Sequence, residues 1–107
     1  MVTIMSTIDP EVLRARFNTE TARIGWNELE RHFARGVVRL VARDLDLVDV
    51  AVAMHADDVQ SIQRWTQDEL IVEPTMNHAA RWHDSNAALW AVVVAHFVLI
   101  QEANDIQ

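Results

Sequence analysis

The stretch that decides the fold is WAVVVAHFVLIQ, residues 90–101. Its apolar side chains occupy both phases of the two-residue strand period, so neither face of a strand built from it is polar. Such a run is typical of a central strand covered on both faces, or of two strands joined by a bulge near Ala95 and His96. We expect one long inner strand.

Two further segments have the composition of strands. Residues 37–42 are rich in β-branched side chains, and residues 70–73 are a short apolar stretch that Pro74 ends. Helical periodicity and capping signals predict helices over residues 10–23, 27–35, 46–55 and 58–69, with a short one after Thr75. The sequence therefore predicts an α+β fold, a sheet of about three strands with four to five helices packed on it.

Capping residues mark the predicted helix ends. Asp9 suits the N-cap of the first helix. Asn27 and Asp57 each stand three residues before a Glu or Gln, which is the spacing of a capping box. Gly36 is placed to adopt the left-handed conformation that ends a helix.

Composition bounds the class of protein. The 107 residues are 50% hydrophobic, enough for one core, so we expect a single globular domain over residues 9–107 after an N-terminal tail, residues 1–8. The chain has no cysteine, no lysine and two glycines. These absences exclude a thiolate nucleophile, a Schiff base and a Gly-rich phosphate loop. The start of the chain has no signal-peptide pattern, and we expect a cytoplasmic protein without a membrane partner.

Charge is unevenly distributed along this acidic chain. The net charge of −7 argues against nucleic acid as a partner, because neutralising phosphate dominates such binding. Residues 1–43 hold seven arginines against five acids, whereas residues 44–107 hold two arginines against eleven acids. The simplest interpretation is that the basic first third forms ion pairs with the acidic remainder. Self-association or an anion site on the basic third are the alternatives.

Several segments together resemble a bacterial family known as domain of unknown function 2288. The resemblance rests on the order and spacing of these segments: Glu20–Leu29, His32–Val38, Asp46–Ala53, Asp57-Asp58 with Trp65 beyond it, and Leu89–Ala95. It covers roughly residues 17–102. The resemblance implies an α+β fold and no mechanism, because the family has no established activity.

The densest group of possible metal ligands is His55, Asp57 and Asp58, which lie at a turn between two predicted helices. One imidazole and two carboxylates could bind Mg²⁺, Mn²⁺ or Zn²⁺ and support a metal-dependent enzyme. The competing interpretation is structural: the aspartates cap and stabilise the following helix, and His55 ends the preceding one. We favour the structural interpretation and expect no cofactor.

A second candidate site contains His32, Arg35 and Arg39 around Gly36. Three groups that carry or can gain positive charge could bind a carboxylate or phosphate. The alternative is that they compensate the helix dipole and pair with acids elsewhere. Trp82 and Trp90 could line a pocket, although tryptophan in such apolar settings more often lies in the core.

No catalytic signature emerges from these patterns. The function that we predict is a non-catalytic interaction or assembly module, with the metal-dependent enzyme and the anion binder as alternatives. We also predict a homodimer, because a strand of eleven nearly consecutive apolar residues, 90–100, would be an aggregation hazard at a sheet edge. A two-fold partner is the commonest way to cover such a surface.

Overall fold

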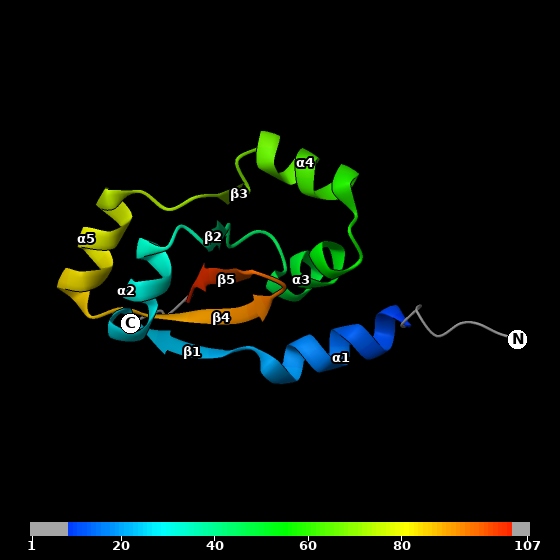
Figure 1. Cartoon of the computed structure of the whole chain (residues 1–107), viewed down its shortest axis with the longest axis horizontal. Coiled ribbons are helices and arrows are strands. Elements are labelled where there is room, and N and C mark those ends of the chain that lie inside the picture. Colours follow the sequence, from blue (N-terminus) through cyan, green and yellow to red (C-terminus); the bar gives the residue numbers. More distant parts are fainter. Residues whose placement is uncertain (1–8, 104–107) are drawn as a thin grey trace, which may run out of the picture.

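A computed structural model describes residues 9–103 of the chain (Figure 1). The helices are α1 (Pro10–Glu20), α2 (Trp26–Ala34), α3 (Leu47–His55), α4 (Val59–Gln67) and α5 (Met76–Ser85). The strands are β1 (Ala22–Gly25), β2 (Val38–Val41), β3 (Ile71–Val72), β4 (Ala88–Val94) and β5 (Phe97–Glu102). The α+β class is confirmed, but the sheet has five strands and not about three. The predicted tail, residues 1–8, lies outside the described residues, as do residues 104–107.

All five strands form one mixed sheet in the order β1-β4-β5-β2-β3. β5 runs parallel to β2, with Val38 opposite Val98 and Leu40 opposite Ile100, and every other neighbouring pair is antiparallel. Two segments expected to be strands, within residues 37–42 and 90–101, are therefore direct neighbours in one sheet. β4 and β5 occupy inner positions, so both of their edges are paired within the chain.

The single long strand predicted over residues 90–101 is wrong, because this segment forms the hairpin of β4 and β5. Val94 pairs with Phe97, which leaves Ala95 and His96 as a two-residue turn. Ala95 has φ 55°, and a positive φ early in the loop lets such a short turn match the strand twist. β5 is apolar in both phases because Val98, Leu99 and Ile100 are buried on alternate faces, whereas β4 leaves Trp90 and Val93 exposed at 38% and 62%.

The first helix is shorter than predicted. It ends at Glu20, where Thr21 turns extended and both its backbone N–H and its hydroxyl donate to the carbonyl of Phe17. Residues 22–25 then pair with β4 as an edge strand. This pairing partner lies some 65 residues away in the sequence, as the bond from Arg23 to Ala88 illustrates. Local periodicity could not reveal it.

Two of the predicted helix ends are confirmed, at Asp9 and Gly36. The side chain of Asp9 accepts a hydrogen bond from the backbone N–H of Glu11, and Gly36 has φ 76° after α2. The capping box predicted at Asn27 is wrong, because α2 begins one residue earlier and has Gly25 as an N-cap without a side-chain bond. None of the helices among the described residues combines the length and apolarity that crossing a bilayer demands.

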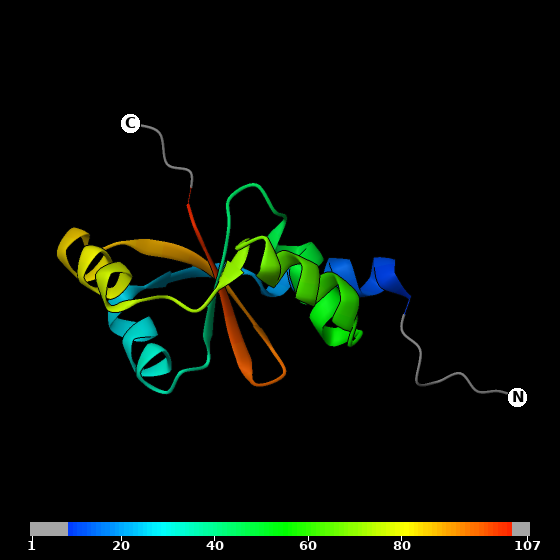
Figure 2. The same ribbon diagram turned by 90° about the horizontal axis from the view of Figure 1, so that it is seen from above.

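Two hydrophobic cores lie on opposite faces of the sheet. The view from above shows α2 and α5 on one side and α1, α3 and α4 on the other (Figure 2). On one face α1 and α3 pack against the strands, with α4 at the margin. On the other face α2 and α5 pack around Trp26 and Trp82. Adjacent residues of β5 serve different cores, since Leu99 belongs to the first and Ile100 to the second. The fold is therefore a three-layer arrangement of helices, sheet and helices.

A candidate interaction groove beside α4

The turn that leads into α4 is held by two aspartates with different tasks. Asp58 is the N-cap: its carboxylate accepts hydrogen bonds from the backbone N–H and the hydroxyl of Ser61, at 3.2 and 2.8 Å. The hydrogen bond from the Ser61 hydroxyl is the main cause that lowers the pKa of Asp58. Asp57, predicted as the cap, instead has φ 60°, a left-handed conformation that aspartate tolerates better than most residues. The N-cap of α4 is therefore one residue later in the sequence than the capping-box spacing predicted.

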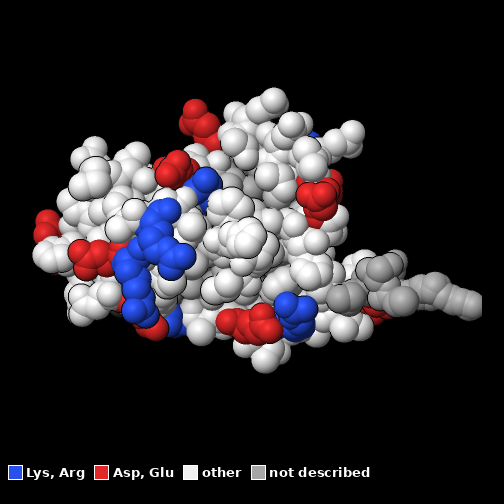
Figure 3. All heavy atoms as spheres, viewed as in Figure 1, with Lys and Arg blue, Asp and Glu red and all other residues white. Residues whose placement is uncertain are grey.

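α4 has an apolar side that the fold covers only in part. Ile62 and Trp65 pack against the first core but stay partly exposed, and no residue of the helix is fully buried. Val59, in its first turn, is 53% exposed. Arg64 is the one charged residue among the nine of this helix, and Figure 3 shows few charged side chains over this part of the surface. A helix of this pattern normally packs against something.

A groove of about 270 Å³ runs beside this helix. Its wall and floor come from α4, the end of α3 and the exposed parts of β2, β3 and β5. The lining residues are Arg39, Met54, Asp57, Asp58, Val59, Ile62, Gln63, Thr66, Ile71 and Phe97. Five of these ten residues are apolar and supply most of the exposed surface of the groove, and charged groups of both signs line it as well.

Arg39 supplies the positive charge of the groove. Its guanidinium lies 5.0 Å from the centre of the Phe97 ring, close enough for a cation–π contact. One guanidinium nitrogen also donates to the carbonyls of Gly36 and Val38, at 3.2 and 2.8 Å. These contacts hold the side chain in place, so the groove combines a fixed cation with the carboxylates of Asp57 and Asp58.

Comparison with known proteins places the chain in a family. The model of a family described as "Protein of unknown function (DUF2288)" matches residues 12–102. The chain belongs to this family. The match reaches from α1 to the end of β5 and confirms the resemblance drawn from the sequence.

A solved structure supports the DUF2288 fold. This chain is similar to the protein in "NMR solution structure of PA1075 from Pseudomonas Aeruginosa", with 38% sequence identity over 88% of this chain and 87% of that chain, and a TM-score of 0.76. No curated protein matches this DUF2288 chain. Neither the family description nor that structure's name states an activity.

The DUF2288 structure does not bring the predicted metal ligands together as a site. Within residues 9–103, no group of three or more His, Cys, Asp or Glu side chains is placed to hold a metal ion. The ring of His55 instead packs edge-on against Phe17, with centroids 5.8 Å apart. Asp58 is engaged by Ser61, as described above.

The second predicted site is also divided. His32 lies in the last turn of α2 and Arg35 is its C-cap, whereas Arg39 crosses into the groove. The groove therefore contains Arg39 from one predicted site and Asp57 and Asp58 from the other. Sequence reasoning did not join them, because their proximity depends on how α4 folds back along the sheet.

Other groove residues were missed by the sequence reasoning. Phe97 was assigned to the middle of an inner strand, and Met54 and Ile62 to the buried sides of helices. One signal was present: the apolar residues of α4 are Val59, Ile62 and Trp65, spaced three apart and separated by polar residues. Such spacing gives the helix one apolar side, and the sequence does not show how much of that side the fold covers.

Proposed function

We propose that this DUF2288 protein is a non-catalytic assembly module whose α4 groove binds a second copy of the same chain. The observation that carries the proposal is an amphipathic helix without a fully buried residue, next to a groove whose surface is mainly apolar. Removing this apolar surface from water is the driving force of most protein association.

A second copy suits the charges of the groove. In a two-fold symmetric contact the same surface of both copies takes part: if residue i of one copy contacts residue j of the other, then j also contacts i. The surface must therefore be complementary to itself. The α4 groove carries Arg39 together with Asp57 and Asp58. Two such grooves facing each other can pair the arginine of one copy with an aspartate of the other, while Val59 and Ile62 meet across the axis.

This proposal keeps the predicted homodimer but replaces its reason. The sequence argument assumed that the apolar segment over residues 90–100 had an edge or face to be covered by a partner. β4 and β5 are inner strands, so the chain itself pairs their edges. The surface that now calls for a partner is the exposed side of α4.

Light scattering at micromolar to submillimolar concentration tests the proposal. We expect a mass near twice the monomer's 12.2 kDa that falls toward this value on dilution. Val59→Asp should weaken association by about tenfold or more, because it places a charge in the apolar contact. Val12→Asp is the matched control, since Val12 is 59% exposed on α1, outside the groove.

Asp57→Asn gives a second, milder test. Asparagine also tolerates the left-handed conformation, so the backbone is preserved while the charge is removed. Association should weaken, and Arg39→Gln combined with it should add little, because both changes break the same ion pair. A mass of 12.2 kDa at every concentration, or a dimer that Val59→Asp leaves intact, would contradict the proposal.

A further inference from the structure

A second hollow lies at the start of α3, between the end of α1, the sheet and the segment 43–47, whereas the groove lies at the end of α3. Its volume is about 580 Å³, within the range of small-molecule sites. The residues that line it are Asn18, Thr21, Arg43, Asp44, Leu45, Asp46, Leu47, Trp90 and Gln101. We call it the Trp90 cleft.

The floor of the Trp90 cleft is a row of side chains from neighbouring strands. Trp90 of β4 pairs with Arg23 of β1 on one side and with Gln101 of β5 on the other. The guanidinium of Arg23 lies 4.8 Å from the centre of the Trp90 ring. The indole nevertheless stays 38% exposed, so it offers apolar surface to a ligand.

Gln101, on the floor of the cleft, holds the segment 42–45, which forms the wall of the cleft, against the sheet. Its amide nitrogen donates to the carbonyls of Ala42 and Leu45, at 2.8 and 2.6 Å. Both amide protons are thereby used, and the side-chain oxygen remains an acceptor. The segment that carries Arg43 and Asp44 is thus held in position without a ligand, which lowers the entropic cost of binding.

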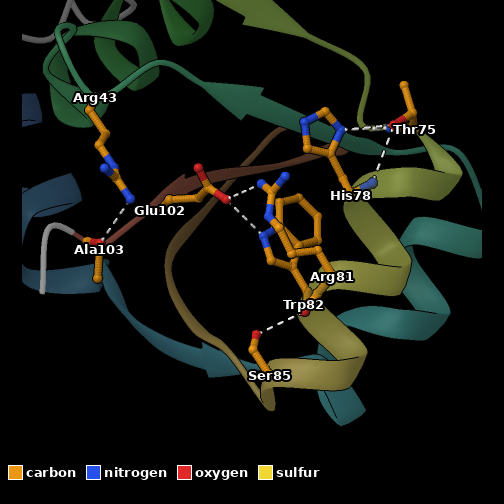
Figure 4. A network of polar contacts seen from close by, with 8 residues as sticks. All are labelled: Arg43, Thr75, His78, Arg81, Trp82, Ser85, Glu102 and Ala103. Atoms are coloured by element: carbon orange, nitrogen blue, oxygen red, sulfur yellow. Dashed lines mark hydrogen bonds and ion pairs between the residues drawn. The ribbon is translucent and has the colours of Figure 1, made fainter.

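The wall offers one cation and one carboxylate that make few hydrogen bonds. Among residues 9–103, the guanidinium of Arg43 donates one hydrogen bond, to the carbonyl of Ala103 at 3.5 Å (Figure 4), and its charge also acts on the carboxylate of Glu102. Asp44 has no interaction partner among residues 9–103. Asp46, the other acid of the cleft, is already used, because it accepts from the backbone N–H of Val48 and from Arg14.

We propose that the Trp90 cleft binds a small zwitterion, an α-amino acid with an apolar side chain. Arg43 pairs with the carboxylate, Asp44 with the ammonium group, and the side chain lies on the exposed surface of Trp90. A charged pair of this kind can be recognised strongly because guanidinium–carboxylate bonds are charge-assisted. A polyanion fits poorly, since Asp44 and Asp46 repel it.

Calorimetric titration with L-phenylalanine tests this inference on the full chain. Two analogues test the two charged groups of phenylalanine separately: 3-phenylpropanoate lacks the ammonium group, and 2-phenylethylamine lacks the carboxylate. We expect saturable binding of phenylalanine and affinities at least about tenfold lower for both analogues, since each loses one charge-assisted contact.

Variants locate the binding. Arg43→Gln and Asp44→Asn should each weaken phenylalanine binding by about tenfold, and Arg43→Gln should not weaken binding of 2-phenylethylamine. Arg31→Gln and Asp68→Asn are controls with the same charge changes at exposed positions outside the cleft, and they should have no effect. In ¹H–¹⁵N spectra the indole signal that Trp90→Phe removes should shift on titration.

Other outcomes overturn the inference. Absence of binding up to millimolar phenylalanine contradicts it, and so does binding that Arg43→Gln and Asp44→Asn leave unchanged. Equal affinity for 3-phenylpropanoate would make the site an anion site and refute the role of Asp44. None of these results depends on whether the α4 groove forms a dimer, because the two surfaces share no lining residue.

Discussion

The carboxylate of Glu102, the last residue of β5, accepts a hydrogen bond of 2.9 Å from the indole nitrogen of Trp82 in α5 (Figure 4). The same oxygen accepts from Arg81 at 2.6 Å. Trp82 is 2% exposed, so its N–H needs a partner inside the protein. Glu102 supplies it and thereby ties α5 to the end of the sheet.

Electrostatics favour the ionised form of Glu102. Partial burial raises the pKa of its carboxyl, but the hydrogen bonds from Trp82 and Arg81 and the charges of Arg81 and Arg43 outweigh burial, so the pKa lies below its ordinary value. A group whose pKa is lowered by folding stabilises the folded state while it is ionised.

Glu102→Gln should lower the free energy of unfolding by about 1 kcal/mol, because the amide oxygen replaces two charge-assisted bonds with weaker ones. Urea unfolding followed by circular dichroism measures this change. Glu30→Gln is the control, since Glu30 is exposed on α2 and has no interaction partner among the described residues; it should change stability by less than about 0.5 kcal/mol. Equal effects of the two variants would contradict a stabilising role of the hydrogen bonds between Glu102 and α5.

The contribution of Glu102 should also depend on pH. Because folding lowers its pKa, its stabilisation is complete above the ordinary glutamate pKa of about 4.3 and is lost as pH falls below it through the folded value. The stability difference between the native chain and Glu102→Gln should therefore shrink between about pH 6 and pH 3. Unfolding curves at several pH values check this, and a constant difference would speak against it.

Ala95→Gly should stabilise the protein by about 0.5 kcal/mol, since alanine with positive φ is strained and glycine is not. Ala80→Gly is the matched control, because Ala80 is exposed inside α5, where glycine costs about 1 kcal/mol. Thermal unfolding distinguishes the opposite signs. A loss of stability at both positions would mean that the hairpin turn is not left-handed at residue 95.

Leu99→Ala and Ile100→Ala should each destabilise the protein by roughly 2–5 kcal/mol, because each side chain is fully buried. Amide hydrogen exchange should separate them. The first should expose α3 preferentially and the second α2, since the two residues serve opposite cores. Val93→Ala, 62% exposed on β4, should cost less than about 1 kcal/mol. Identical exchange patterns for the first two variants would contradict a two-core sheet.

Local chemistry made several parts of the fold predictable. Asp9, Asp46 and Thr75 accept hydrogen bonds from backbone N–H groups within three residues, so the cap and its helix are neighbours in sequence. Gly36 ends α2 for a similarly local reason. The sequence also predicted ion pairs between the basic first third of the chain and the acidic remainder. Arg14 forms two of them, with Asp46 and Asp49.

The errors occurred where partners are distant. Residues 22–25 become a strand because β4 is beside them, and Trp90 stays exposed because no helix covers that part of the sheet. An apolar run over residues 90–101 is compatible with one covered strand or with two, and the side chains do not distinguish them. The turn at Ala95 and His96 contains neither glycine nor asparagine, the residues that usually indicate a two-residue hairpin turn in a sequence.

The sequence by itself determined the α+β class, most helix starts and the presence of an inner apolar strand segment, because periodicity and capping act over a few residues. It also determined the family, through the order and spacing of the segments that resemble it. The tertiary structure alone decided the five-strand order, the two cores and both proposed surfaces. The Trp90 cleft joins side chains up to 83 residues apart, from Asn18 to Gln101, and the α4 groove joins Arg39 to Phe97, 58 residues apart. Such proximity arises from burying both faces of one sheet, a constraint on the whole chain that no local pattern encodes.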